Sequence, residues 1–198
     1  MRQNIFKKKD LITSPWSGGT TTQLAIYPHD ADYKKRNFIF RLSTALVTDE
    51  ESAFTKLPEV YRLLMVLDGE LEINHKNEYS KTLKKFDIDK FKGEWETTSK
   101  GKIRDFNLMT KGNTVGELNS IILGKTEERQ VHLFENFNII SYYAYKGNFI
   151  IDANNKKKTI NEGDIVLFYK KNTNKQIKIT ALTDCEIIKS QILTSPKR

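Results

Sequence analysis

The sequence predicts an all-β protein, and three observations lead to this fold class. Ten segments of five to eight residues are rich in Ile, Val, Phe, Tyr and Thr, and clusters of Gly, Asn, Asp and Lys separate them. An Asp68-Gly69 dipeptide, which suits a tight hairpin turn, lies between two of these segments. Long amphipathic helical patterns are absent, and Val115–Leu123 is expected to form one short helix. Many short, evenly spaced strands are typical of a barrel or sandwich, because closing or doubling a sheet removes exposed edges.

The expected strands fall into two related halves. A second hairpin is expected at Lys146-Gly147, and it repeats the Asp68-Gly69 turn further along the chain. We therefore expect one half at residues 1–112 and a second at residues 113–198, packed closely together. The ten expected strands are Gln23–Tyr27, Phe38–Ala45, Tyr61–Leu67, Glu70–Asn74, Ile103–Met109, Asn138–Tyr145, Asn148–Asp152, Asp164–Tyr169, Ile177–Leu182 and Glu186–Leu193.

Composition favours a globular cytoplasmic protein. The chain has 198 residues, of which 38% are hydrophobic, and this is enough to bury a sizeable core. No run approaches the ~20 apolar residues of a membrane-spanning helix, and the first residues lack the apolar stretch of a signal peptide. The single cysteine, Cys185, excludes an internal disulfide and a Cys-based zinc or redox site.

The net charge of +8 raises the question of nucleic-acid binding. The lysines, however, occur in short clusters such as residues 7–9, 34–36 and 156–158, and 25 acidic residues are mixed with them. No nucleic-acid recognition motif accompanies these clusters. A solvated Lys-rich surface therefore explains the charge, and we expect no nucleic-acid partner.

A glycine-rich segment precedes the first expected strand. Residues 14–23 read Ser-Pro-Trp-Ser-Gly-Gly-Thr-Thr-Thr-Gln, in which Trp16, Gly18, Gly19 and Thr20 are candidate binding residues. Glycines let a backbone approach a ligand closely, and hydroxyls donate to ligand oxygens. The phosphate-loop pattern is not met. A plain turn before a strand explains the segment equally well.

Arg41 and Ser43 share one face of an expected strand, because side chains alternate with a period of two. The opposite face carries Phe38, Phe40 and Leu42. In a half-solvated sheet, polar residues usually point outward, so this pattern alone favours solvent over a barrel interior for Arg41.

Asp105 and Asn107 likewise share one strand face, where they could hold an arginine, present polar groups to a ligand, or face solvent. Arg62 is more unusual, because it shares a face with Leu64 and Val66. A guanidinium on an apolar face is costly unless it is paired. Arg62 therefore has a partner or a ligand, or lies at the solvated end of its strand.

The histidines argue against a metal centre. His29, His75 and His132 are isolated from one another, whereas a metal-binding jelly roll carries a His-x-His pair followed by Glu and a further His. Each is interpreted as a surface or loop residue. No Ser-His-Asp or Cys-His arrangement can be assembled from spacing, and we expect no metal and no cofactor.

Taken in order, several of these motifs resemble the HutD/Ves family. The resemblance covers about the first 110 residues, and the second half matches only in its pattern of strands. In this chain Ser17-Gly18-Gly19, Gln23 and Phe40 depart from the pattern of many relatives. The matching motifs are Pro15-Trp16-Ser-Gly-Gly-Thr-Thr-Thr, Arg41-x-Ser43-x-Ala45, Phe54-x-x-Leu57-Pro58 leading to Arg62, Leu67-x-Gly69, Phe91-x-Gly93 and Asp105-Phe-Asn107-Leu-Met109-Thr.

The resemblance implies a double-cupin fold, with two jelly-roll barrels in one chain and the more recognisable pocket in the first. It also implies a regulatory or small-molecule-binding role in histidine utilisation, with an acidic intermediate such as formylglutamate as ligand and no secure enzymatic activity. On this basis Arg41, Ser43, Arg62, Asp105 and Asn107 would line the barrel interior, with Trp16 near its mouth.

Three functions stay open at this point. In the leading one, Arg41 and Arg62 hold the carboxylate of a small acidic metabolite, while Ser43, Asn107 and the backbone of residues 18–20 donate and accept hydrogen bonds. The second is a metal-independent isomerase or lyase with Asp105 or a tyrosine as acid or base. The third is a scaffold in which Arg41 or Arg62 pairs with Asp105. Exposed strand edges would also allow a homodimer, although no feature specifies an interface.

Overall fold

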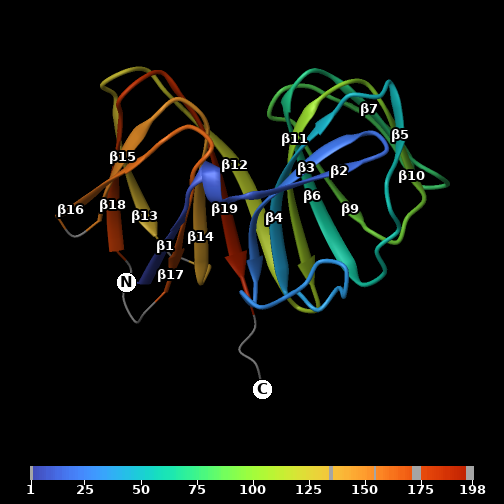
Figure 1. Cartoon of the computed structure of the whole chain (residues 1–198), viewed down its shortest axis with the longest axis horizontal. Coiled ribbons are helices and arrows are strands. Elements are labelled where there is room, and N and C mark those ends of the chain that lie inside the picture. Colours follow the sequence, from blue (N-terminus) through green and yellow to red (C-terminus); the bar gives the residue numbers. More distant parts are fainter. Residues whose placement is uncertain (1, 134–135, 154, 171–174, 195–198) are drawn as a thin grey trace. The chain divides into compact units, whose positions relative to one another are not determined.

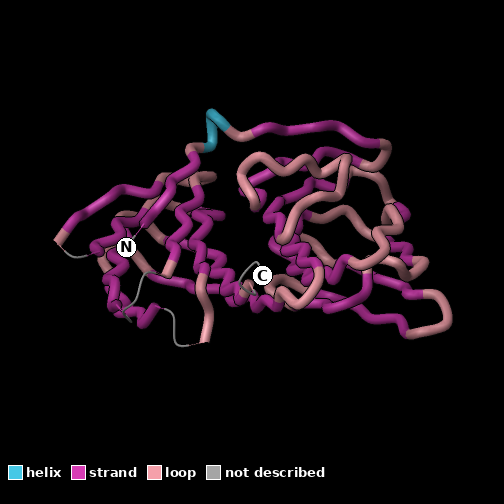
Figure 2. The backbone as a smooth tube through the Cα atoms, turned by 90° about the horizontal axis from the view of Figure 1, so that it is seen from below, coloured by secondary structure: helices cyan, strands magenta, loops and turns pink. Residues whose placement is uncertain are grey.

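The computed structural model confirms the all-β fold. It describes residues 2–133, 136–153, 155–170 and 175–194, and these residues form strands and one three-residue 3-10 helix, η1 (Lys8–Asp10) (Figure 2). Unit 1 comprises Met1–Asp10 and Val115–Arg198, and unit 2 comprises Leu11–Thr114. Within the described residues, no helix is long and apolar enough to cross a membrane.

Unit 2 contains two antiparallel sheets (Figure 1). The six-stranded sheet has the order β2-β3-β4-β11-β6-β9, and the four-stranded sheet has the order β5-β10-β7-β8. Their strands are β2 (Ile12–Trp16), β3 (Gly19–Tyr27), β4 (Phe40–Val47), β5 (Glu51–Ala53), β6 (Val60–Asp68), β7 (Leu71–His75), β8 (Tyr79–Leu83), β9 (Ile88–Lys92), β10 (Thr97–Lys100) and β11 (Arg104–Lys111).

Unit 1 also contains two antiparallel sheets, with the orders β1-β17-β14-β19-β12 and β13-β18-β15-β16. All ten strands expected from the sequence are present in the two units, with ends shifted by up to four residues. The strands of unit 1 are β1 (Arg2–Phe6), β12 (Val115–Leu123), β13 (Glu128–Leu133), β14 (Ile139–Lys146), β15 (Phe149–Ala153), β16 (Lys156–Ile160), β17 (Ile165–Tyr169), β18 (Lys175–Ala181) and β19 (Cys185–Leu193).

The first ten residues lie in unit 1, although the sequence placed them in the half formed by residues 1–112. β1 pairs with β17 along its whole length. Lys7 Nζ forms a salt bridge of 2.8 Å with the buried carboxylate of Asp164, and the backbone N–H of Lys8 donates to the same carboxylate at 2.9 Å. The ladder and the partly buried charge pair therefore attach this segment to the later half of the chain.

The expected helix at Val115–Leu123 is wrong, because this segment forms β12. Each of its nine residues pairs with β19, from Val115 opposite Leu193 to Leu123 opposite Cys185. A continuous ladder outweighs the weak local preference of so short a helix, which has few hydrogen bonds of its own.

The interiors of the two units differ in polarity. An apolar cluster that includes Tyr142, Phe149 and Phe168 fills the interior of unit 1. In unit 2 the cluster of Val47, Leu64, Val66, Leu71, Ile73, Leu83, Phe91 and Ile103 joins both sheets, and polar side chains lie beside it. Aligning the halves at their hairpin glycines explains the contrast. Arg62 stands seven residues before Gly69, and the equivalent residue, seven before Gly147, is Ile140.

Candidate functional site

Two arginines lie in one row across the middle of the six-stranded sheet. On β11, Met109 pairs with Arg41 of β4 on one side and with Arg62 of β6 on the other. Residues paired across antiparallel strands point to the same face, so both guanidinium groups project to the same side of the sheet. The exposed fractions of Arg41 and Arg62 are 6% and 7%, so both cations are buried.

The next two rows place further polar groups on that face. Asn107 pairs with Ser43 of β4, and Asp105 pairs with Ala45. Asn107 and Asp105 are two residues apart on β11, so both share the face of the arginines. The exposed fractions of Ser43, Asn107 and Asp105 are between 2% and 5%. The sheet thus presents a column of buried polar groups beside an apolar core.

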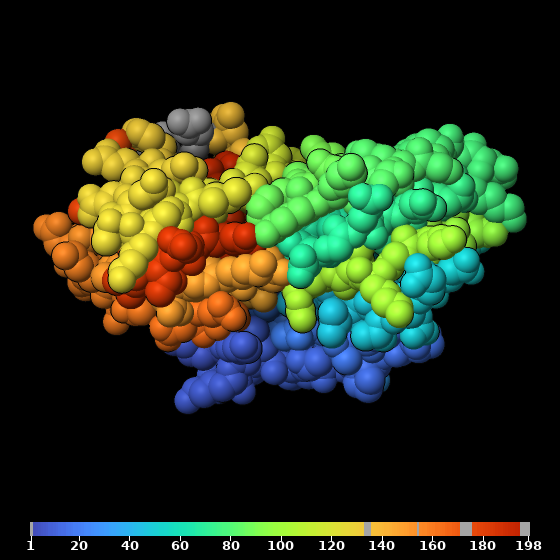
Figure 3. Space-filling view, turned by 90° about the horizontal axis from the view of Figure 1, so that it is seen from above, coloured from blue at the N-terminus to red at the C-terminus, as the bar shows by residue number. Residues whose placement is uncertain are grey.

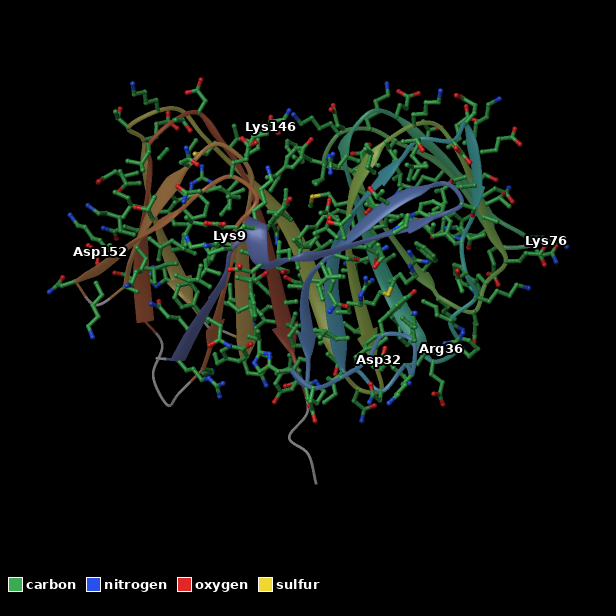
Figure 4. The ribbon with its side chains drawn as sticks, viewed as in Figure 1. Lys9, Asp32, Arg36, Lys76, Lys146 and Asp152 are labelled. Carbon is green, nitrogen blue, oxygen red and sulfur yellow. The ribbon has the colours of Figure 1, made fainter. Side chains whose placement is uncertain are left out.

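These side chains line a cavity of about 590 Å³ inside unit 2. A volume of this size is ordinary for a small-molecule pocket. The cavity walls come from β2 to β6, β11 and the segment between β3 and β4, which carries the labelled residues Asp32 and Arg36 (Figure 4). The lining residues with polar or aromatic side chains are Ser14, Trp16, Ser17, Thr21, Gln23, Asp32, Tyr33, Lys34, Arg41, Ser43, Ser52, Phe54, Thr55, Arg62, Asp105 and Asn107.

Arg41 is held by neighbours on three sides. Its Nε donates to Gln23 Oε1 at 3.0 Å, and its Nη1 donates to Ser43 Oγ at 3.2 Å. The guanidinium also lies 4.2 Å from the ring centroid of Tyr33, a cation–π distance. Burial lowers the pKa of Arg41 despite the nearby Tyr33 and Asp105, which act in the opposite direction.

Arg62 has aromatic neighbours, and no described residue forms a hydrogen bond or a salt bridge with its side chain. Its guanidinium lies 4.7 Å from the ring centroid of Phe54 and 5.2 Å from that of Phe91. Its buried Nε has no hydrogen-bond acceptor among the described residues. The buried Oδ1 of Asn107 likewise has no hydrogen-bond donor among them. Buried polar atoms are nearly always hydrogen-bonded, so an unpaired donor and an unpaired acceptor on residues of one cavity wall point to a partner that the described residues do not supply.

Burial dominates the charges of Arg62 and Asp105. It lowers the pKa of Arg62 from 12.5 to about 10, and it raises the pKa of Asp105 from 3.8 to about 6. Each residue favours the charged form of the other, but this attraction only partly offsets the loss of water. Asp105 Oδ1 also accepts a hydrogen bond of 3.2 Å from the backbone N–H of Ala45.

The structure brings six of the nine predicted site residues to the cavity wall, namely Trp16, Arg41, Ser43, Arg62, Asp105 and Asn107. For Arg41 and Ser43, the expectation from alternation alone is wrong, because both faces of β4 are buried. Phe40 and Leu42 on the opposite face are fully buried as well, so β4 has no solvated side toward which polar residues could point.

Gly18, Gly19 and Thr20 do not line the cavity, and the two glycines serve packing instead. A Cβ at Gly18 would lie 2.3 Å from the Trp16 ring, and one at Gly19 would lie 1.9 Å from the carbonyl oxygen of Leu46. Thr20 points away because Thr21, the next residue on β3, faces the cavity. The segment is therefore a tight hairpin that positions Trp16.

Sequence reasoning missed Gln23, Tyr33, Phe54 and Met109 as cavity residues. Phe54 belongs to one of the motifs that carried the family resemblance, and Gln23 is the first residue of an expected strand. Both positions were therefore noted in the sequence, but neither was assigned to the binding site. Tyr33 lies outside the strands, between β3 and β4, and nothing in its local sequence indicates that it stacks on an arginine.

A second hollow, of about 760 Å³, lies on the other sheet of unit 2, whose β7 and β8 form the green region in Figure 3. It is the larger of the two hollows. Its polar residues Glu72, Asn74 and Thr98, however, are exposed on the outer side of the sheet. Exposed groups are already solvated and gain little from a ligand, so we assign the candidate site to the cavity whose polar groups are buried.

His75 is buried, which corrects its interpretation as a surface or loop residue, whereas His29 and His132 are exposed. The imidazole of His75 is hydrogen-bonded to Thr97 Oγ1 at 2.8 Å and to Asp89 Oδ2 at 2.8 Å. All three residues are at most 3% exposed and do not line the cavity. This Thr–His–Asp chain joins β7 and β10 to β9 of the other sheet, and its position indicates a structural role.

The cavity does not offer the donors that a divalent transition metal requires. Among the described residues, no three His, Cys, Asp or Glu side chains form a group that could hold a metal ion. The polar cluster at the centre of the cavity consists of two guanidinium cations, one carboxyl, one amide and one hydroxyl. Cations repel a metal, and imidazole ligands are missing from this set.

Comparison with known proteins decides the family. The chain matches HutD over residues 8–188. It belongs to the HutD family. A comparison with curated protein sequences found no match. The match covers nearly the whole length of this HutD-family chain, including every residue of the cavity.

Solved structures resemble the HutD-family chain over its full length. The conserved protein of unknown function PA5104 from Pseudomonas aeruginosa PAO1 gives a TM-score of 0.84 at 20% identity, over 98% of this chain and 100% of that one. HutD from Pseudomonas fluorescens SBW25, solved in a formate condition, gives a TM-score of 0.74 at 16% identity, over 98% of this chain and 100% of that one. The bacterial pirin YhhW from Escherichia coli, in complex with nickel(II), gives a TM-score of 0.71 at 13% identity, over 98% of this chain and 100% of that one. At these identities the likeness shows a shared cupin-like fold.

Proposed function

We propose that this HutD-family chain is a double-cupin protein whose unit 2 binds a small acidic metabolite of the formylglutamate type, with a regulatory role in histidine catabolism. Family membership supports the pathway, and the two sheets within each unit support the double jelly-roll arrangement. The binding role rests on the cavity itself.

One observation carries the proposal, namely the buried Nε of Arg62 without an acceptor. An N–H of a guanidinium removed from water and left unpaired costs free energy, and a carboxylate oxygen would satisfy it. Arg41, in the same row, bonds Gln23 and Ser43 through Nε and Nη1, and its Nη2 has no hydrogen-bond partner among the described residues, so it offers a second donor to the same anion. Asn107 Oδ1, also unpaired, would accept an N–H or O–H of the ligand.

Isothermal titration calorimetry with a panel of dicarboxylates and N-acyl amino acids tests the proposal. We expect binding by the unmodified protein and its loss in the double variant Arg41→Ala/Arg62→Ala. Arg104→Ala serves as the matched control, because Arg104 lies on β11 beside Asp105 but does not line the cavity. Equal affinities in the unmodified protein and the double variant, or no binding to any member of the panel, would reject the proposal.

A second candidate, a lyase or isomerase, is favoured by one observation. Asp105 is a carboxyl in a ligand-sized cavity with a pKa of about 6, which lies near the pH at which a general acid or base operates. Turnover of a bound acid that survives chelation of metals and disappears in Asp105→Asn would establish this candidate. Binding of the acid without turnover would instead support the role of a binding protein.

A further inference from the structure

We propose that Asp105 selects the charge of the ligand, so that an acid with two carboxylates enters the cavity together with one proton, which Asp105 binds. This inference rests on the proposed function and adds to it the charge class of the ligand. Asp105 is therefore a specificity-determining residue that does not itself hold the carboxylates.

The geometry leaves the Asp105 carboxyl weakly compensated. The side chain is 5% exposed and lines the cavity wall. Its one hydrogen bond is the 3.2 Å contact from the backbone N–H of Ala45 to Oδ1, and no described residue forms a salt bridge with it. A buried carboxylate with one long hydrogen bond is close to the point at which it takes up a proton.

The charged groups that act on Asp105 come from three strands. β6 contributes Arg62, β4 contributes Arg41, and its own strand contributes Arg104 on the opposite face. The segment between β3 and β4 places Tyr33 and the exposed, oppositely charged Asp32 and Lys34 at the cavity wall. The other polar residues that line the cavity are neutral, namely Ser14, Ser17, Thr21, Gln23, Ser43, Ser52, Thr55 and Asn107.

The charge balance inside the cavity then limits what can enter. Arg41 and Arg62 carry two positive charges, and ionised Asp105 carries one negative charge, so the buried groups have a single net positive charge. One ligand carboxylate neutralises them. A second carboxylate would leave a net negative charge in a site removed from water, which is costly unless a proton is bound.

Asp105 is the group that takes this proton. Its pKa of about 6 lies just below neutrality, and an anion placed beside it raises that pKa further. The arginines keep their protons at neutral pH, since even the buried Arg62 has a pKa of about 10. The carboxylate of Asp105 takes up a solvent proton and becomes a neutral carboxylic acid, and two arginines then face two ligand carboxylates.

Calorimetric titration in buffers of different ionisation enthalpy measures the protons bound with the ligand. The probes are two matched pairs, succinate with succinamate and glutarate with glutaramate, in which the second member has an amide in place of one carboxylate. At neutral pH we expect uptake of close to one proton per dicarboxylate and a clearly smaller uptake for the matched monoamide. The affinity for the dicarboxylate should fall about tenfold for each pH unit above neutrality.

The variant Asp105→Asn keeps the shape and the Oδ1 acceptor but cannot titrate. We expect its proton uptake to vanish and its affinity for succinate at neutral pH to rise about tenfold, because a group with a pKa near 6 no longer has to be protonated first. Asp49→Asn is the control, since Asp49 is an exposed acid of unit 2 outside the cavity, and it should keep the uptake of the unmodified protein. Were Asp105→Asn not to fold, the two matched pairs in the unmodified protein still decide the question.

The outcomes separate this inference from the proposed function. Three results would overturn the inference and leave the acid-binding role intact. A dicarboxylate could bind without proton uptake, it could bind with the same uptake as its monoamide, or its proton uptake could persist in Asp105→Asn. A lack of binding by all four probes would overturn both.

Discussion

Arg62 and Asp105 line the same cavity and each alters the pKa of the other, yet they form no direct salt bridge. In a scaffold barrel whose polar groups satisfied only one another, these two side chains would be in contact. Their separation leaves a guanidinium donor without an acceptor and a carboxyl with one hydrogen bond. The arrangement is costly without a bound anion, and the anion that we propose would offset this cost.

Arg62→Met separates binding from stability. Methionine fills a similar volume between Phe54 and Phe91 without a charge, so we expect the free energy of unfolding to stay the same or rise. Affinity for a carboxylate should fall about 10- to 100-fold, which corresponds to one lost charge-assisted hydrogen bond. Denaturant unfolding and calorimetry measure the two quantities.

The control for Arg62→Met is Arg104→Met, which removes an arginine from the strand beside the site without touching the cavity. A loss of stability in Arg62→Met, with no change in affinity, would mean that Arg62 is a structural residue.

Asp105 makes the stability of the protein depend on pH. Its pKa is raised to about 6 in the folded state from 3.8, so between these values the folded state binds more protons than the unfolded state. The free energy of unfolding contributed by this group therefore falls as pH rises through that window, by about 3 kcal/mol in total, and is restored on acidification.

The difference in unfolding free energy between Asp105→Asn and the unmodified protein isolates this contribution. We expect the two proteins to be similar near pH 4 and the variant to be the more stable above about pH 6, because its amide carries no charge. Chemical denaturation across this range measures the difference. A difference that does not vary with pH would show that Asp105 keeps an unperturbed pKa.

The predicted strands include the most apolar and buried ones, such as β6, β14 and β17, whereas strands made mostly of exposed polar residues were missed. β8 (Tyr79–Leu83) and β16 (Lys156–Ile160) have a single buried residue each, at their last position, and Lys156–Lys158 reads as a surface charge cluster. Both are edge strands that depend on one neighbouring strand for their hydrogen bonds. Such strands form because a partner is present, and a local pattern does not record that partner.

For the site, the family resemblance predicted which side chains share the interior, whereas local strand patterns alone did not. An arginine on an apolar strand face indicated that Arg62 has a partner or a ligand, or lies at a solvated strand end. The structure buries its guanidinium beside Phe54 and Phe91 and leaves its Nε without an acceptor among the described residues. The register that aligns Arg41, Met109 and Arg62 in one row depends on pairing between strands far apart in the sequence. Burial of both faces of β4 likewise depends on tertiary packing, which is why alternation alone pointed Arg41 toward solvent.

The Thr97–His75–Asp89 chain should contribute to stability and not to binding. His75→Phe removes the imidazole that donates a hydrogen bond to the buried carboxylate of Asp89. That carboxylate would then retain the hydrogen bond from the Tyr79 hydroxyl at 3.0 Å and the ion pair with Lys81 at 3.8 Å. We expect a loss of about 2–3 kcal/mol in the free energy of unfolding, because a buried charge loses its main partner. Affinity for carboxylates should be unchanged.

A double-mutant cycle with Asp89→Asn tests whether the two residues act as a pair. Coupling above about 1 kcal/mol is expected for groups in direct contact within one network. A variant His75→Phe that is as stable as the unmodified protein would show that aromatic packing against Phe91 and Trp95, at 4.5 Å and 5.3 Å between ring centroids, is all that this position requires.

Gly19→Ala tests whether the glycine-rich segment serves packing. A Cβ at this position would lie 1.9 Å from the carbonyl oxygen of Leu46, so β3 and β4 must separate where they border the cavity. We expect a loss of more than about 2 kcal/mol in the free energy of unfolding. Gly112→Ala is the matched control, because Gly112 also has a positive φ, of +60°, but nothing lies within 4 Å of its added Cβ. Its cost should be limited to about 1 kcal/mol of backbone strain. Equal losses in the two variants would show that backbone conformation alone requires glycine at position 19, and that the contact with Leu46 plays no part.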